Sequence, residues 1–195
     1  MSLLVVDHGT NLMPSLLDLL PPETILCLWN DIADYDMNTF EGIILSGGSL
    51  FEIEGNESLL INEMVQIKNC KRPTLGICYG MEILVKAYGG TLKKMPLDHQ
   101  GMIEVQVTDT NTILGNLERF FIYEHHQWKV EMLPSDFIPL AYSVHGYEAI
   151  QHRFRPHYGL QFHPEKITET PIGKNIIQTF LSQTKNRQDE LLAVV

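Results

Sequence analysis

The stretch Gly76-Ile77-Cys78-Tyr79-Gly80 stands between a short apolar run and a segment with helical spacing. The apolar run is led in by Arg72-Pro73-Thr74-Leu75, and the helical segment at 81–88 stops at Gly89-Gly90. This order predicts a strand, a tight turn flanked by small residues, and a helix, which is the arrangement called a nucleophile elbow. The N-terminus of the helix lies behind the sulfur and favours a thiolate. The stretch therefore predicts that Cys78 is a catalytic nucleophile.

Apolar runs alternate with helical segments on the N-terminal side of this turn. Continuous apolar runs are typical of strands that are covered on both faces of a sheet. We expect strands at 3–6, 24–29, 43–45 and 75–77. We expect helices at 12–20 and 56–68, the second capped by Asn56 or Ser58 and apolar along Leu59, Leu60, Met64 and Ile67. The strand–helix–strand order predicts a parallel sheet with helices on both faces.

The pattern changes after Gly90. Alternation with a period of two predicts antiparallel or mixed strands at 102–107, in parts of 120–130, at 137–143 and at 147–152. A further strand is expected at 158–162, and Pro171 is expected to start a final helix with an apolar stripe. The fold class is therefore α/β: an open, mostly parallel sheet with helices on both faces and an added antiparallel or mixed strand region. We expect one domain at residues 1–184 and a C-terminal tail at 185–195.

The bulk composition narrows the class of protein. The 195 residues suit one globular domain, and the formal net charge of −10 argues against nucleic acid or an anionic membrane as the main partner. No apolar run approaches the roughly 20 residues of a membrane span, and residues 1–7 carry no signal-peptide pattern. Cys27, Cys70 and Cys78 form an odd set without short metal-ligand spacing, so we expect reduced thiols and a cytoplasmic location.

A cysteine nucleophile needs a base, a group that orients the base, and donors for the developing oxyanion. His163 and Glu165 stand at the end of an expected strand, so we expect them to be the base and the orienting group. The backbone N–H groups of Gly48 and Tyr79 are the expected oxyanion-hole donors. A charged His163 would lower the pKa of the Cys78 thiol.

Three motifs occur in order along the chain: Leu45-Ser46-Gly47-Gly48, then Gly76-Ile77-Cys78-Tyr79-Gly80-Met81, then Gly159-Leu160-Gln161-Phe162-His163-Pro164-Glu165. Through these motifs the chain resembles a class I, triad-type glutamine amidotransferase domain from about residue 3 to residue 181. The resemblance implies an open-sheet, flavodoxin-like fold and a Cys–His–Glu triad that hydrolyses the side-chain amide of glutamine. It also implies that the first two motifs supply the oxyanion hole.

Within this family the chain most resembles the glutaminase subunit of two-subunit GMP synthetases, through its Cys-Tyr-Gly-Met sequence, its Gly89-Gly90 pair and its Glu124-His125-His126 segment. Glu82 stands where the family has Gln, and Trp128 stands where it has Asp. The resemblance implies that Glu82, Gln127 and Trp128 contact the substrate or communicate with the synthetase.

The same resemblance implies the partners and cofactors of the chain. L-glutamine would be the substrate, and an ATP-dependent synthetase subunit would receive the ammonia, with conversion of XMP to GMP as the expected reaction. Free ammonia is protonated and diluted in water, which is why a synthetase partner is expected. No cofactor is expected in this chain, because ATP and Mg²⁺ would belong to the partner.

Other functions fit the same residues. An amidotransferase subunit would also serve another acceptor, of the imidazole glycerol phosphate or chorismate type. A stand-alone hydrolase of γ-glutamyl compounds would need no partner. A non-catalytic regulatory or binding subunit would keep the fold, and only Glu82 and Trp128 favour that interpretation.

The histidine-rich part of the sequence also bears on metal binding. The spacing of His125, His126, His152 and His157 matches no standard metal site, and no second cysteine stands near them. The sequence therefore predicts no metal site. The Gly47-Gly48 pair lacks the following Lys-Ser/Thr of a phosphate-binding loop.

Overall fold

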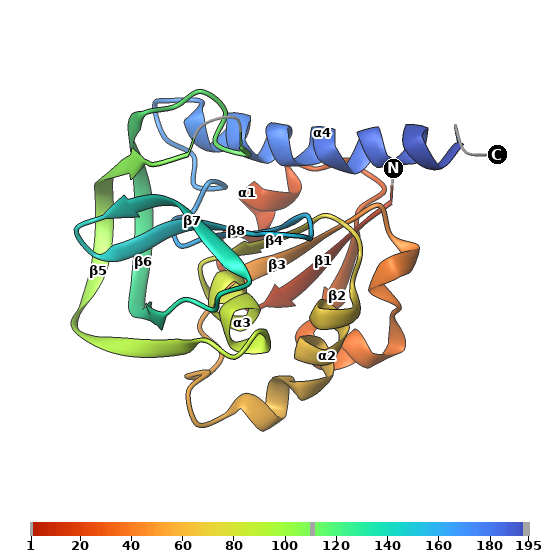
Figure 1. Cartoon of the computed structure of the whole chain (residues 1–195), viewed down its shortest axis with the longest axis horizontal. Helices are drawn as coiled ribbons and strands as arrows, with labels where there is room; N and C mark the ends of the chain where they lie inside the picture. Colours follow the sequence, from red (N-terminus) through yellow and green to blue (C-terminus); the bar gives the residue numbers. More distant parts are fainter. Residues whose placement is uncertain (1, 110–111, 193–195) are drawn as a thin grey trace.

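The computed structural model describes residues 2–109 and 112–192, and the side chains of these residues through 185. In this part of the chain a nine-stranded sheet has the order β2-β1-β3-β4-β9-β8-β7-β5-β6 (Figure 1). The strands are β1 (Leu3–His8), β2 (Ile25–Leu28), β3 (Gly42–Gly48), β4 (Thr74–Ile77), β5 (Thr91–Val107), β6 (Arg119–Met132), β7 (Phe137–Ser143), β8 (Gly146–His152) and β9 (His157–Leu160). The α-helices are α1 (Met13–Leu17), α2 (Ile61–Asn69), α3 (Tyr79–Ala87) and α4 (Ile172–Leu192), with 3₁₀ turns η1 (Trp29–Asp34), η2 (Met37–Thr39) and η3 (Glu57–Leu60).

One half of the sheet is parallel and consists of β2, β1, β3, β4 and β9. The side chains of β1 from Leu3 to Val6 are fully buried, as expected for a strand that is covered on both faces. The order of these five strands is that of flavodoxin-like sheets, in which ligands bind beyond the carboxyl ends of the strands. The predicted parallel sheet is confirmed, and it directs the search for a site to the ends of β1, β3, β4 and β9.

The other half of the sheet is antiparallel. β9 joins the two halves, because it pairs parallel with β4 and antiparallel with β8. β5 and β6 form a long ribbon at the far edge of the sheet (Figure 1). The strand expected at 102–107 is only the second part of β5, since the pairing with β6 shifts register between Lys94 and His99. Such an irregularity breaks the period-two pattern, which is why the first part of β5 was not predicted.

Helices cover both faces of the sheet, as the sequence predicts (Figure 1). On one face α1 and α4 pack on the strands, with Leu16, Ile177 and Phe180 fully buried. On the other face α2 and α3 bury Ile67 and Leu84. The fold class, an α/β open sheet with an added antiparallel region, is therefore confirmed.

Two details of the helices differ from the prediction. The helix expected at 12–20 ends at Leu17, because residues 19 and 20 close i-to-i+3 turns instead. The expected cap of the second helix is wrong: η3 precedes α2, and the Asn56 side chain donates to the Glu52 carbonyl and accepts no hydrogen bond from a helix N–H. Three residues per turn in η3 also rotate Leu59 to the surface, where it is 55% exposed.

The ends of the last two elements also differ from expectation. β9 ends at Leu160, before the expected residue 162, because the chain bends there and the His163 N–H donates to the Tyr123 carbonyl of β6 at 2.9 Å. The backbone of α4 continues through Leu192. The domain boundary at 184 stays a prediction, and residues 193–195 of the expected tail lie outside the described residues. Within the described residues, none of the helices is long and apolar enough to cross a membrane.

Candidate active site

The turn between β4 and α3 holds Cys78 in a strained backbone conformation. Its φ of 48° and ψ of −105° make it the one non-glycine residue with a positive φ in the described part of the chain. Such a conformation is costly and persists only where neighbours enforce it. The Cys78 N–H donates to the Leu160 carbonyl at 2.6 Å, and the Cys78 carbonyl accepts from the Glu82 N–H at 3.1 Å. β9 and the first turn of α3 therefore hold the elbow from both sides.

The glycines on each side of Cys78 are required by close backbone contacts. A Cβ on Gly76 would lie 2.5 Å from the Gly80 carbonyl oxygen, and a Cβ on Gly80 would lie 2.2 Å from the Leu45 carbonyl oxygen. Neither backbone oxygen can move without distorting β3 or the elbow. The small residues that suggested the elbow in the sequence are thus explained by the packing of the turn against β3.

His163 and Glu165 follow β9 and face the elbow. The Nδ1 of His163 lies 2.8 Å from Glu165 Oε1, and both side chains are buried. A carboxylate only accepts, so Nδ1 carries the hydrogen. The other ring nitrogen is left for Cys78, whose charge and hydrogen bonding raise the pKa of His163. This is the order of contacts that a nucleophile, a base and an orienting carboxylate require.

Burial and neighbouring charges together determine the pKa values of His163 and Cys78. Burial lowers the pKa of His163, but the charges and hydrogen bonds of Cys78 and Glu165 outweigh this and hold the pKa well above its usual range. Burial raises the pKa of the Cys78 thiol, and the opposing charge of His163 does not cancel this rise. The expected effect of His163 is present, because its charge and hydrogen bonding lower the thiol pKa, but burial outweighs that effect. The Cys78 sulfur also lies 3.6 Å from the His125 carbonyl oxygen, which accepts from a thiol and disfavours a thiolate.

Glu82, on α3 one turn after Cys78, is buried beside the Cys78 sulfur. The Gln161 side-chain amide lies 3.3 Å from Glu82 Oε1 and 3.8 Å from Cys78 Sγ. Burial raises the pKa of Glu82 to about 7, although the Gln161 hydrogen bond and the charges of His126 and His163 lower it in part. Gln161 belongs to the third motif but was not predicted as a site residue. Its position two residues before His163 was the signal that could have identified it.

The loop that ends β3 carries Gly48 into the site. A Cβ on Gly48 would lie 2.1 Å from the His8 carbonyl oxygen, so only glycine fits there. Below the loop, the His8 N–H donates to Ser46 Oγ at 3.0 Å, and the His8 ring lies 3.2 Å from the Ser46 carbonyl oxygen and 3.0 Å from a carboxylate oxygen of Glu63. His8 and Glu63 are fully buried and were not predicted. Their sequence signals were weak: His8 stands at the end of an apolar strand, and Glu63 stands beside the apolar side of an amphipathic helix.

A cavity of about 690 Å³ opens over the elbow. It is lined by seven of the eight predicted site residues, namely Gly48, Cys78, Tyr79, Glu82, Gln127, Trp128 and His163. The eighth, Glu165, is held behind His163. Gln127 and Trp128 reach the cavity from β6, and the Lys94 ammonium lies over the Trp128 ring, 5.7 Å from its centroid. The tertiary structure thus brings all the predicted site residues to one place.

Comparison with known proteins agrees with this geometry. Residues 6–184 match the family model described as glutamine amidotransferase class-I. The chain is 34% identical over 142 residues to a separate subunit of the glutamine-hydrolyzing GMP synthase of Methanothermobacter thermautotrophicus, and the match covers 72% of this chain and 73% of that protein. It is 33% identical over 144 residues to the glutamine-hydrolyzing GMP synthase of Spiroplasma kunkelii, covering 73% of this chain. The chain spans only 27% of the length of the Spiroplasma protein.

A solved structure extends the likeness to the whole fold. The structure described as a putative GMP synthase subunit from Thermoplasma acidophilum has a TM-score of 0.88 to this chain at 25% identity. The match covers 98% of this chain and 97% of that one. With the elbow, the triad geometry and the sheet order already in place, the match over residues 6–184 shows that this chain belongs to the class I glutamine amidotransferase family.

Proposed function

We propose that this chain is the glutaminase subunit of a GMP synthase, which hydrolyses the side-chain amide of glutamine and delivers ammonia for the amination of XMP. The observation that carries the proposal is the geometry at Cys78: a nucleophile on a strained elbow, in contact with a histidine that Glu165 orients, at the base of a cavity of about 690 Å³. The relatives that are named as separate subunits of GMP synthase support the choice of acceptor.

In the first half of the proposed reaction, the Cys78 thiol gives its proton to His163 and the sulfur attacks the amide carbon of glutamine. The negative charge that develops on the amide oxygen is placed between the N–H groups of Gly48 and Tyr79. His163 then protonates the leaving nitrogen, and ammonia departs from a γ-glutamyl thioester. The hydrogen bond from His163 Nδ1 to Glu165 keeps the imidazole oriented for both transfers.

In the second half, water attacks the thioester carbon. His163 takes a proton from this water, and the tetrahedral intermediate collapses by breaking the carbon–sulfur bond. The proton returns to the sulfur, glutamate leaves, and the free thiol is regenerated. Every step uses His163 as the one group that both accepts and donates a proton, which is consistent with its raised pKa beside Cys78 and Glu165.

Glutamine contacts and the partner complete the proposal. Glu82 and Gln161 lie at the base of the cavity, and Gln127 and Trp128 line it from β6, so we assign these side chains to binding of the substrate. The acceptor of ammonia is an ATP-dependent synthetase subunit, to which ATP and Mg²⁺ belong. The three free cysteines are consistent with the cytoplasmic location that forms part of this proposal.

The test combines the purified chain with the synthetase subunit of the same organism. We expect glutamate release from glutamine to rise when the synthetase, XMP, ATP and Mg²⁺ are present, and GMP to form with glutamine as the nitrogen source. A glutamine-analogue electrophile should label Cys78, as read by intact mass and peptide mapping. Cys78→Ala should abolish labelling and activity, whereas Cys27→Ala, a change at a buried cysteine outside the cavity, should retain both.

The other outcomes distinguish the alternatives. Glutaminase activity that is coupled to a different acceptor enzyme would support glutamine hydrolysis at Cys78. It would contradict the proposal that the ammonia is used to make GMP. High activity of the chain alone on γ-glutamyl peptides would favour a stand-alone hydrolase. Absence of labelling and of glutamate release, with a synthetase that is active on added ammonia, would favour a non-catalytic subunit.

A further inference from the structure

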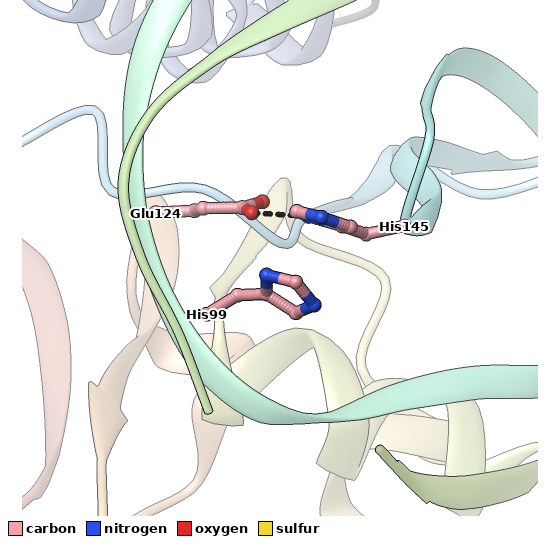
Figure 2. Close-up of side chains that lie close together, drawn as sticks. All are labelled: His99, Glu124 and His145. Atoms are coloured by element: carbon pink, nitrogen blue, oxygen red, sulfur yellow. Dashed lines mark hydrogen bonds and ion pairs between the residues drawn. The ribbon is translucent and has the colours of Figure 1, made fainter. Parts of the chain in front are cut away.

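A second group of polar side chains lies beside the catalytic cavity, at the antiparallel end of the sheet. His99 comes from β5, Glu124 from β6, and His145 from the turn between β7 and β8. Figure 2 shows the three side chains pointing toward one another. One potential ligand atom from each lies within 4.8 Å of the other two, and His145 Nδ1 is 2.5 Å from Glu124 Oε1. Two imidazoles and a carboxylate thus converge from three separate elements.

The donor set and its spacing suit a divalent transition metal of the zinc type. Zinc binds imidazole nitrogen and carboxylate oxygen at about 2.0–2.2 Å, which in a tetrahedral site places the ligand atoms about 3.3 Å apart. The observed separations, from 2.5 Å to within 4.8 Å, bracket this value. Small movements of these side chains would therefore change the hydrogen bond of Glu124 and His145 into shared coordination. The rings of His99 and His145 are already stacked, with centroids 3.5 Å apart.

The groups behind the three side chains hold them in place. The second oxygen of Glu124 lies 3.2 Å from His126 Nε2, and His126 Nδ1 lies 2.7 Å from the Trp128 carbonyl oxygen. The His145 N–H donates to Ser143 Oγ at 2.9 Å, which fixes the turn that carries the imidazole. Metal sites need such outer hydrogen bonds, because they orient the ligands before the ion arrives.

A buried carboxylate next to the cluster provides independent evidence for a cation. Glu148 is 1% exposed, and its Oε1 accepts from Ser143 Oγ at 2.6 Å. Its Oε2 has no hydrogen-bond partner among the described residues. A ligand atom of Glu148 lies within 4.8 Å of those of Glu124 and His126. An unpaired buried carboxylate oxygen is costly, and a metal ion held by the neighbouring Glu124 would reduce that cost.

The cluster also faces open space. A cavity of about 560 Å³ is lined by His99, Glu124 and His145. It leaves room for a water or another small ligand to complete the coordination, as in zinc sites with three protein ligands. Gln100 lines both this cavity and the catalytic one, so the two sites are neighbours.

We propose that His99, Glu124 and His145 bind one divalent transition-metal ion of the zinc class. The ion ties the β7–β8 turn to the β5–β6 ribbon, and through Glu124 and His126 it contacts one wall of the catalytic cavity. This proposal departs from the sequence expectation of no metal site, which considered only His125, His126, His152 and His157. It concerns binding of an ion and does not depend on the proposed function.

The test is a titration of tag-free, chelator-treated full-length chain with Co²⁺, followed by visible absorption, and with Zn²⁺, followed by calorimetry. Both use the Cys78→Ser variant, because Cys78 and His163 are themselves able to bind zinc. We expect one ion per chain and the absorption bands of Co²⁺ with nitrogen and oxygen ligands. His99→Gln and His145→Gln should each weaken binding more than about tenfold, since loss of a ligand costs more than loss of an outer partner.

His125→Gln is the matched control. This exposed histidine is adjacent to the cluster in sequence but pairs with Asp98, and its change should leave metal affinity unaltered. Nitrogen-15 NMR of histidine rings offers a measurement without cluster variants: zinc should shift the ring nitrogens of His99 and His145 and not those of His125. The proposal is overturned if no ion binds, if binding survives His99→Gln with His145→Gln, or if zinc leaves the ring nitrogens of His99 and His145 unshifted.

Discussion

Glu82 and Cys78 share one hydrogen-bond donor, the side-chain amide of Gln161, which lies 3.3 Å from the carboxyl oxygen and 3.8 Å from the sulfur. When the buried Glu82 carboxyl is charged, its negative charge disfavours ionisation of the nearby Cys78 thiol. Glu82, one of the two residues that depart from the family pattern, is therefore expected to make the ionisation of Cys78 depend on pH.

The first prediction concerns the reactivity of the nucleophile. Above pH 7 the Glu82 carboxylate is charged and raises the pKa of the Cys78 thiol, so Glu82→Gln should accelerate alkylation of Cys78. The rate of iodoacetamide reaction, followed by mass spectrometry, should rise several-fold at pH 8 and change little at pH 6. We also expect a lower KM for glutamine in this variant, because the family has Gln at this position. Equal alkylation rates at pH 8 would show that Glu82 does not influence the thiol.

The same burial predicts how stability depends on pH. The folded-state pKa of Glu82, about 7, lies above its ordinary value of 4.5, so the folded chain holds a proton that the unfolded chain releases in this window. The contribution of Glu82 to stability is thus present at low pH and is lost as pH rises through 7. Glu82→Gln should be more stable than the wild type at pH 8 by about 3 kcal/mol, and similar to it at pH 4.5. Urea unfolding of both proteins at the two pH values measures this difference in the free energy of unfolding. The same difference at pH 4.5 and pH 8 would contradict the prediction.

A third prediction tests the packing of the elbow. Gly80→Ala places a Cβ 2.2 Å from the Leu45 carbonyl oxygen, so it should destabilise the chain by at least about 2 kcal/mol and suppress labelling of Cys78. Gly89→Asn is the comparison, because Gly89 has a φ of +85° with nothing near its Cβ position, and Asn tolerates that conformation. Thermal unfolding should show a much larger loss of stability for Gly80→Ala than for Gly89→Asn. Equal losses of stability would show that the close contact of Gly80 with Leu45 is not the cause.

The fourth prediction concerns the orientation of the base. Glu165→Gln removes a charge that raises the pKa of His163, so the imidazole should titrate at lower pH than in the wild type. Under the proposed function, kcat for glutamine should fall by about 100-fold or more, with little change in KM. Histidine NMR titration gives the first quantity and a coupled glutamate assay gives the second. An unchanged titration would mean that Glu165 only packs against the ring.

The parallel half of the sheet and its helices could be predicted because their signals are local. Continuous apolar runs such as 3–6 and helical stripes such as that of α4 depend on neighbours within a few residues. The first part of β5 could not be predicted, because its pairing with β6 is maintained across a register shift that hides the alternation. The exposure of Leu59 depends on a 3₁₀ turn, which the same hydrophobic pattern does not distinguish from an α-helical turn.

The sequence by itself predicted the chemistry that we propose at the elbow, because Cys78 and its flanking glycines form one local turn and His163 and Glu165 stand on another. Such short segments encode backbone geometry directly. Only the tertiary structure decided what surrounds them: the Gln161 amide between Glu82 and Cys78, the buried His8–Glu63 pair, and the cluster of His99, Glu124 and His145. These groups are distant in sequence and meet through the order of the strands. Burial raises the pKa values of Glu82 and Cys78, and no local sequence pattern measures burial.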